Sequence, residues 1–195
     1  MIDVAAYLAT SAASAASLAA RPGAAAIERA ARLIGEALAA GGQVLFCGNG
    51  GSAADAQHLA AELVGQLGLG VDRPAYRAVA LTVDTSALTA IGNDLGYDRV
   101  FERQVEGLGR PGDVLVAIST SGGSANVVRA AAAARAAGLT VLALLGPEPA
   151  ALDLHADLAL HVPGAVPCVI QQGHITIGHA LCALVERLLA GRPRA

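Results

Sequence analysis

His58 and Glu62 stand four positions apart in the amino-acid sequence, and both side chains can carry a proton. If the segment is helical, this spacing places them on one face. Such a pair can act as a base with an orienting partner, or supply two ligands to a metal ion. Exposed helix faces often carry pairs of this kind without a function, so the spacing alone leaves a surface pair open.

A second polar group interrupts an otherwise apolar segment near the C-terminus, at Gln171, Gln172, His174 and His179. Polar side chains in such a segment are costly unless they are paired or face water. On a helix, Gln172 falls nearer to the face of His179 than Gln171, which is offset by about 80°. Each histidine can equally be a structural residue. Periodicity therefore leaves open which glutamine is functional.

Two loops of small residues are typical of anion binding, at 48–52 and 119–124. Each follows a buried-looking strand and opens a helix, whose free backbone N–H groups and positive dipole end suit a phosphate. The alternative is an ordinary capped turn rich in Ser and Gly. Ala53 stands where a dinucleotide-binding fingerprint requires its third glycine, so a nucleotide site is weakly indicated.

The elements that position these residues alternate along the chain. The patterns predict strands at 43–47, 78–81, 113–118, 140–145 and 157–161. They predict helices at 3–20, 24–40, 52–65, 98–107, 125–137 and 166–190, with Arg21 and Pro22 ending the first, Ser52 capping the third and a turn at 92–94. This alternation predicts an α/β fold with a doubly wound parallel sheet, which binds ligands at the carboxyl ends of its strands.

Length and composition exclude several functions. The 195 residues predict a single domain spanning 1–195, with a helical arm at 1–40 and an α/β core at 41–190. All 13 basic residues are Arg, which excludes a Schiff-base lysine and a Walker-type phosphate loop. Two Phe, three Tyr and a net charge of −3 argue against a nucleic-acid partner.

The cysteines and the N-terminal segment bear on localisation. The three cysteines are far apart and indicate neither a disulfide framework nor a metal knuckle, so a cytoplasmic setting is expected. The uncharged run 4–20 consists mostly of Ala and Ser and is shorter than a membrane span. No membrane association is therefore expected.

Four segments in register resemble the phosphoheptose isomerases, the sedoheptulose-7-phosphate isomerase branch of the SIS (sugar isomerase) fold. They are 47–63, 92–94, 118–126, and the pair 170–171 with His179. The resemblance implies a five-stranded parallel sheet between helices, with N-terminal helices that assemble a homotetramer. It also implies interconversion of sedoheptulose 7-phosphate and D-glycero-D-manno-heptose 7-phosphate through an enediol.

The same resemblance implies roles for individual residues. Glu62 and His179 match the catalytic pair, and zinc would be held by His58, Glu62, Gln171 and His179. The resemblance thus selects Gln171 as the functional glutamine, whereas the helical angle places Gln172 nearer to the face of His179. The residues that match the family's phosphate-binding positions are Ser119, Thr120, Ser121 and Ser124. The other positions that match substrate-binding residues are Asn49, Gly50, Gly51, Glu62, Asn93, Asp94 and Gln171.

This sequence departs from the family pattern at three places. Gln66 stands where these enzymes often have a substrate-binding Arg, Gly123 replaces the usual Asn of the serine loop, and Val169 replaces a common basic residue. These changes keep open an isomerase or binder of another phosphosugar. A further alternative is a non-enzymatic relative that binds the bacterial replication initiator. The retained acid–base and metal-ligating set favours the enzyme.

Overall fold

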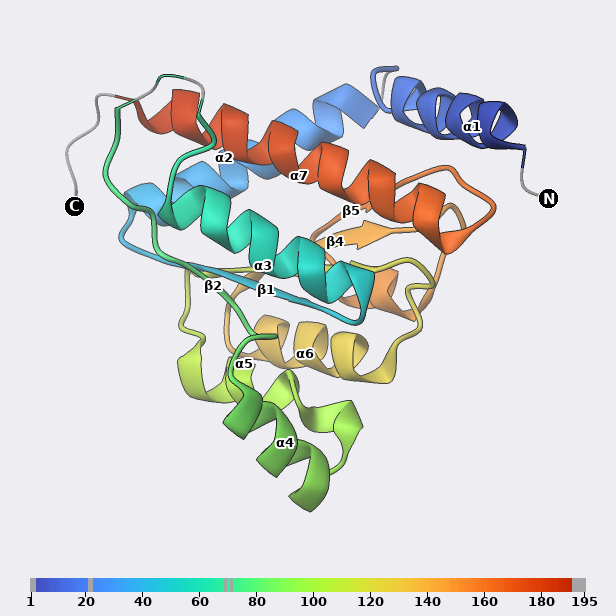
Figure 1. The fold of residues 1–195 in the computed structure, drawn as a ribbon. Coiled ribbons are helices and arrows are strands. Elements are labelled where there is room, and N and C mark those ends of the chain that lie inside the picture. Colours follow the sequence, from blue (N-terminus) through green and yellow to red (C-terminus); the bar gives the residue numbers. More distant parts are fainter. Residues whose placement is uncertain (1–2, 21–22, 69, 71, 191–195) are drawn as a thin grey trace.

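The computed structural model describes residues 3–20, 23–68, 70 and 72–190, which form one five-stranded parallel sheet between two layers of helices (Figure 1). The strands are β1 (Val44–Gly48), β2 (Ala78–Ala80), β3 (Val114–Ser119), β4 (Thr140–Leu145) and β5 (Leu158–His161). The helices are α1 (Val4–Ser17), α2 (Gly23–Ala39), α3 (Gly51–Val64), α4 (Thr85–Asp94), α5 (Glu102–Leu108), α6 (Ala125–Ala136) and α7 (Pro167–Leu189), with short 3₁₀ helices η1 (Tyr97–Arg99) and η2 (Ala151–His155). The predicted α/β fold with a parallel sheet is confirmed.

The central strands are buried on both faces, which explains their continuous apolar runs. Side chains alternate between two cores, as strand geometry requires. Val44, Phe46 and Val116 pack under α2, α3 and α7, whereas Leu45 and Leu115 pack against α5 and α6. Figure 1 shows these helix layers on opposite sides of the sheet.

The strand order β2-β1-β3-β4-β5 creates a switch point between β1 and β3. From β1 the chain moves outward to β2, then returns to build β3, β4 and β5 on the other side. The helix after β1, α3, covers one face, and the helix after β3, α6, covers the other. Connections that leave in opposite directions open a crevice at the carboxyl ends of these two strands.

Two local expectations are wrong. Ser52 does not cap α3: the helix begins at Gly51, and the preceding Gly50 has a left-handed φ of 56° with no side-chain cap. The segment 92–94 is not a turn but the end of α4, because Leu95 N–H still donates to Ile91 C=O at 2.8 Å. The chain reverses at Gly96, where φ is 96°. Arg21 and Pro22, expected to end the first helix, lie outside the described residues; α1 itself ends at Ser17.

Helix α7 is the central helix of its layer and packs against α1, α2 and α3. Among the described residues it is the one helix long and apolar enough to span a membrane, by length and composition only. Half of its most apolar stretch is buried inside the protein, as in the core helix of a globular domain.

Candidate active site

The predicted site residues lie at or beside the carboxyl ends of β1 and β3. The glycine loop (Gly48–Ser52) joins β1 to α3, and the serine loop (Ser119–Ser124) joins β3 to α6. Because β1 and β3 pair in register through Gly48 and Ile118, the two loops start side by side. Two segments distant in sequence thus form one site at the switch point.

His58, Glu62 and His179 come together, from α3 and α7. The Nε2 atom of His58 lies 3.3 Å from Oε1 of Glu62 and 2.8 Å from Nε2 of His179. The Glu62 side chain is 19% exposed and that of His58 is 48% exposed. The group therefore combines a partly shielded carboxylate with two imidazoles that remain accessible from solvent.

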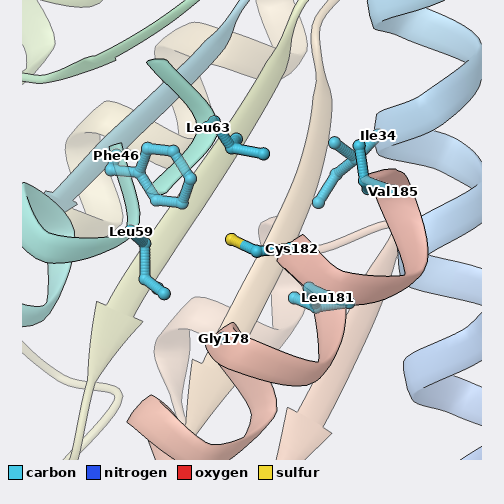
Figure 2. Close-up of a pocket in the computed structure, with 8 residues that line it drawn as sticks. All are labelled: Ile34, Phe46, Leu59, Leu63, Gly178, Leu181, Cys182 and Val185. Carbon is cyan, nitrogen blue, oxygen red and sulfur yellow. The ribbon is translucent and has the colours of Figure 1, made fainter. Parts of the chain in front are cut away.

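Gly178 lets the two helices approach closely enough to form this group. A Cβ atom at Gly178 would lie 2.4 Å from Cδ2 of Leu59. Leu59 and Gly178 directly neighbour His58 and His179, so their close packing holds the two imidazoles together. Figure 2 shows Leu59, Gly178 and Cys182 beside a cavity of about 10 Å³, lined by apolar side chains and with room for at most one water.

The thiol of Cys182, which lines this cavity, is not a candidate nucleophile. Burial raises its pKa to about 12, so it stays protonated and packs as a small apolar group.

Gln171, not Gln172, faces α3. The carboxamide of Gln171 lies against Gly51, so close that a Cβ there would be 2.7 Å from its Nε2. Gln172 instead donates from Nε2 to the hydroxyl of Tyr7 on α1, at 2.8 Å. An angular offset on α7 does not show the path of α3, which runs beside α7 and brings Gly51 against Gln171. His174 is fully buried, and its Nε2 lies 3.0 Å from the backbone oxygen of Leu145, as expected of a structural histidine.

The serine loop presents an open helix N-terminus. Ser124 is the N-cap residue of α6 but makes no side-chain cap. Its Oγ lies 3.2 Å from Oγ of Ser119, whose hydroxyl accepts from Gly122 N–H at 3.1 Å. Thr120 is half-buried and Ser121 is exposed at the loop surface. The first backbone N–H groups of α6 and these hydroxyls are therefore suited to an anion.

Asn93 and Asp94 lie at the exposed end of α4, where Nδ2 of Asn93 donates to Oδ1 of Asp94 at 2.7 Å. Tyr97, three residues further along, connects this segment with the glycine loop: its hydroxyl donates to Oδ1 of Asn49 at 3.2 Å. Sequence reasoning missed Tyr97. A lone tyrosine after a glycine carries no local signal of its partner in the glycine loop.

Asp55, one turn before His58 on α3, has a perturbed carboxyl group. Partial burial raises its pKa to about 6, against the opposing effect of His58, and its Oδ2 has no hydrogen-bond partner among the residues that the structure describes. Sequence reasoning missed it as well. When it is protonated, the Asp55 carboxyl is neutral, so its negative charge is then absent from the surroundings of His58.

The donor set of His58, Glu62 and His179 fits a divalent transition metal. Zinc binds imidazole nitrogen and carboxylate oxygen at about 2.0–2.2 Å, so tetrahedral ligand atoms lie roughly 3.4 Å apart. The three donor atoms here all lie within 4.8 Å of one another. Gln171 lies further back along α7, at Gly51, and its side chain would have to turn toward the group to join it.

Comparison with known proteins places the chain in one family. The SIS domain model matches residues 6–146. A phosphoheptose isomerase from Akkermansia muciniphila is 53% identical over 165 residues, 85% of this chain and 86% of the relative. Another from Rhodospirillum rubrum is 54% identical over 164 residues, 84% of this chain and 86% of the relative.

Solved structures agree with the sequence relatives. The phosphoheptose isomerase from Neisseria gonorrhoeae superposes with a TM-score of 0.85 at 44% identity, covering 94% of this chain and 97% of that one. The phosphoheptose isomerase from Francisella tularensis superposes with a TM-score of 0.88 at 35% identity, covering 94% of this chain and 96% of that one. With most of the chain matched in sequence and in fold, this protein belongs to the SIS domain family, among relatives that are phosphoheptose isomerases.

Proposed function

We propose that this protein is an aldose–ketose isomerase that converts sedoheptulose 7-phosphate to D-glycero-D-manno-heptose 7-phosphate. The observation that carries the proposal is the joining of Glu62, His58 and His179 from two helices, with Nε2 of His58 within 3.3 Å of both partners. The relatives described above are named for this class of activity and span nearly the whole chain.

The chemistry requires one base and one acid. Isomerisation moves a proton between C1 and C2 through a cis-enediol. Glu62 takes the proton from carbon, and His179 gives a proton to the carbonyl oxygen. Each such group contributes about 10²–10⁴-fold to the rate.

The other end of the substrate is placed at the serine loop. The hydroxyls of this loop and the open N-terminus of α6 bind the phosphate without any lysine. The phosphate-binding residues are Ser119, Thr120, Ser121 and Ser124. The residues proposed to bind the sugar hydroxyls are Asn49, Gly50, Gly51, Asn93, Asp94 and Gln171.

Zinc is the proposed cofactor, held by His58, Glu62 and His179 with Gln171 as the fourth ligand. Bound there, it would polarise the substrate's carbonyl and hydroxyl oxygens as a Lewis acid. A carboxylate bound tightly to a cation is a weaker base, so Glu62 cannot be a full ligand and a full base at once.

Zinc is expected to stabilise the folded protein. A metal that binds only the native state at about one hundred times its Kd adds roughly 2.7 kcal/mol to the free energy of unfolding. We expect thermal unfolding with and without zinc to show this gain, His179→Asn to abolish it, and Gln171→Ala to weaken it. His155→Asn is the matched control, because His155 lies in η2, which packs against α6 and β4. An equal zinc response in wild type and His179→Asn would contradict the site.

Three departures from the family bear on the exact sugar. Gln66 lies just past the end of α3, Gly123 lies in the exposed part of the serine loop, and Val169 is buried near the start of α7. An arginine at position 66 would add positive charge at the end of α3 that lies away from the glycine loop, and a basic residue at 169 would add it near the start of α7. An isomerase of another phosphosugar therefore remains the second candidate.

The proposed setting follows from this chemistry. The substrate is a small sugar phosphate, and neither nucleic acid nor a membrane is a proposed partner. We place the protein in the cytoplasm as a homotetramer, in which α1 and α2 supply subunit contacts. An adaptor that binds the replication initiator is disfavoured for two reasons. The relatives of this chain are named as enzymes, and an adaptor needs no acid–base group.

The function is tested by incubating the purified protein with sedoheptulose 7-phosphate, with and without zinc, and following the anomeric proton signals of the aldose by NMR. We expect conversion that depends on zinc. Conversion of a different phosphoketose alone would support the second candidate. No conversion under either condition, together with initiator binding, would favour the adaptor.

A further inference from the structure

Asn49 and Asn126 pair across the crevice between the glycine loop and α6, although 77 positions separate them in sequence. Nδ2 of Asn49 donates to Oδ1 of Asn126 at 2.8 Å, and Nδ2 of Asn126 donates to Oδ1 of Asn49, also at 2.8 Å. Asn126 is 4% exposed. The two carboxamides therefore form a reciprocal, part-buried pair, in which each donates one hydrogen bond to the other.

The placement of this amide pair gives it a geometric role. Asn49 directly precedes the N-terminus of α3, which carries His58 and Glu62. Asn126 lies in the first turn of α6, directly after the serine loop. These helices cover opposite faces of the sheet, so the pair links the helix that holds the acid–base group to the helix that holds the phosphate site.

Tyr97 attaches a third segment to the same carboxamide. Its hydroxyl donates to Oδ1 of Asn49 at 3.2 Å, and the residue as a whole is 63% exposed. A carbonyl oxygen accepts about two hydrogen bonds, and both are used here. Of the Asn49 side chain, a single Nδ2–H is left for a substrate.

We propose that Asn126 is a positioning residue: through its pair with Asn49 it sets the separation between the phosphate site and the acid–base group. The inference rests on the proposed function and extends it. Asn126 itself touches no reacting atom. The Asn49 carboxamide is held by two other segments, through Asn126 on α6 and Tyr97 on η1, and offers the sugar one donor in a fixed direction.

Kinetics distinguish this role from phosphate binding. Asn126→Ala removes both hydrogen bonds of the pair, and we expect kcat/KM for the phosphoketose to fall about 10- to 30-fold, mostly in kcat. Inorganic phosphate occupies the serine loop alone, so its inhibition constant is expected to stay within about twofold. Tyr97→Phe removes one weaker contact, and a smaller loss in the same direction is expected.

Val127→Ala is the matched control. Val127 is the next residue on α6, is fully buried in the core beneath it, and has no polar side chain. Its truncation is expected to lower the melting temperature and to leave kcat within about twofold. If Asn126→Ala keeps kcat/KM within twofold of wild type, or raises the inhibition constant of phosphate with kcat unchanged, the proposal is overturned.

A second measurement needs no turnover. In urea unfolding of wild type, Asn49→Ala, Asn126→Ala and the double variant, the midpoint shift of the double variant is expected to be clearly smaller than the sum of the single shifts. Additive shifts would show that the pair is not coupled and would overturn the proposal. If wild type converts no phosphosugar, the proposed function fails while this cycle still tests the pair.

Discussion

Replacing Glu62 with glutamine is expected to lower kcat about 10²–10⁴-fold while phosphate binding stays intact. Glutamine keeps the size and one acceptor oxygen of the side chain, so α3 and its packing are preserved. What it loses is the ability to take the proton from the carbon. Because Glu62 lies on α3 and the serine loop precedes α6, the phosphate site is not expected to change.

The measurement is kcat from the NMR assay, paired with the inhibition constant of inorganic phosphate. In D₂O, wild type is expected to place deuterium at C2 of the aldose, and the variant to do so at the same reduced rate as turnover. Glu36→Gln, at an exposed position of α2, is the matched control and should behave as wild type. Turnover near the wild-type rate in Glu62→Gln would remove Glu62 as the base.

The zinc content of the variant separates the two roles of Glu62. If the variant binds zinc as wild type does and is still inactive, the carboxylate acts as the base. If it has lost the metal and excess zinc restores turnover, the carboxylate is mainly a ligand. Measuring bound metal and rate on the same samples decides between them.

The sequence predicted the fold well because each strand of the sheet has its own local signal. The continuous apolar run at 114–118 is typical of a strand in a sheet covered on both faces, and the helices between strands favour a parallel arrangement. The loops at 48–52 and 119–124 then had to meet at one edge. Expectations failed where a residue type fits two structures: Gly92, Asn93 and Asp94 favour turns but also end a helix, and the chain reverses at Gly96 instead.

The positioning residues could not be predicted, because their partners are far away in sequence. Asn126 pairs with Asn49, which is 77 positions away in sequence, and Arg73 pairs with Glu186, which is 113 positions away. Neither lies in a periodic pattern with its partner. The choice of Gln171 over Gln172 came from resemblance alone, since an angular offset on one helix does not show where the neighbouring helix runs.

Replacing Arg73 with methionine is expected to lower the free energy of unfolding by about 3–5 kcal/mol. Nε and Nη2 of Arg73 both lie 2.8 Å from Oε1 of Glu186, and each side chain is 1% exposed. Without the guanidinium, Glu186 is left as a buried charge. Leu67 N–H, which donates to the same oxygen at 3.0 Å, satisfies one hydrogen bond but supplies no charge.

Two comparisons show how much of the loss comes from the unpaired charge of Glu186. Urea unfolding at one protein concentration measures the loss for Arg73→Met. Arg103→Met removes an exposed i,i+3 partner of Glu106, and a loss of about 1 kcal/mol or less is expected. Combining Arg73→Met with Glu186→Met removes the stranded charge and should recover part of the stability. A loss for Arg73→Met as small as that for Arg103→Met would contradict the role of the buried pair.

The recovery in the double variant is expected to be incomplete, because Arg73 also holds the end of α3. Nη2 donates to the backbone oxygen of Glu62 at 2.7 Å and Nη1 to that of Leu63 at 2.9 Å. These carbonyls have no partner within the helix, since they lie in its last turn. Arg73 thereby fixes the backbone from which the Glu62 carboxylate extends. The double variant should therefore fold yet show reduced kcat, which links the buried ion pair to the acid–base group above it.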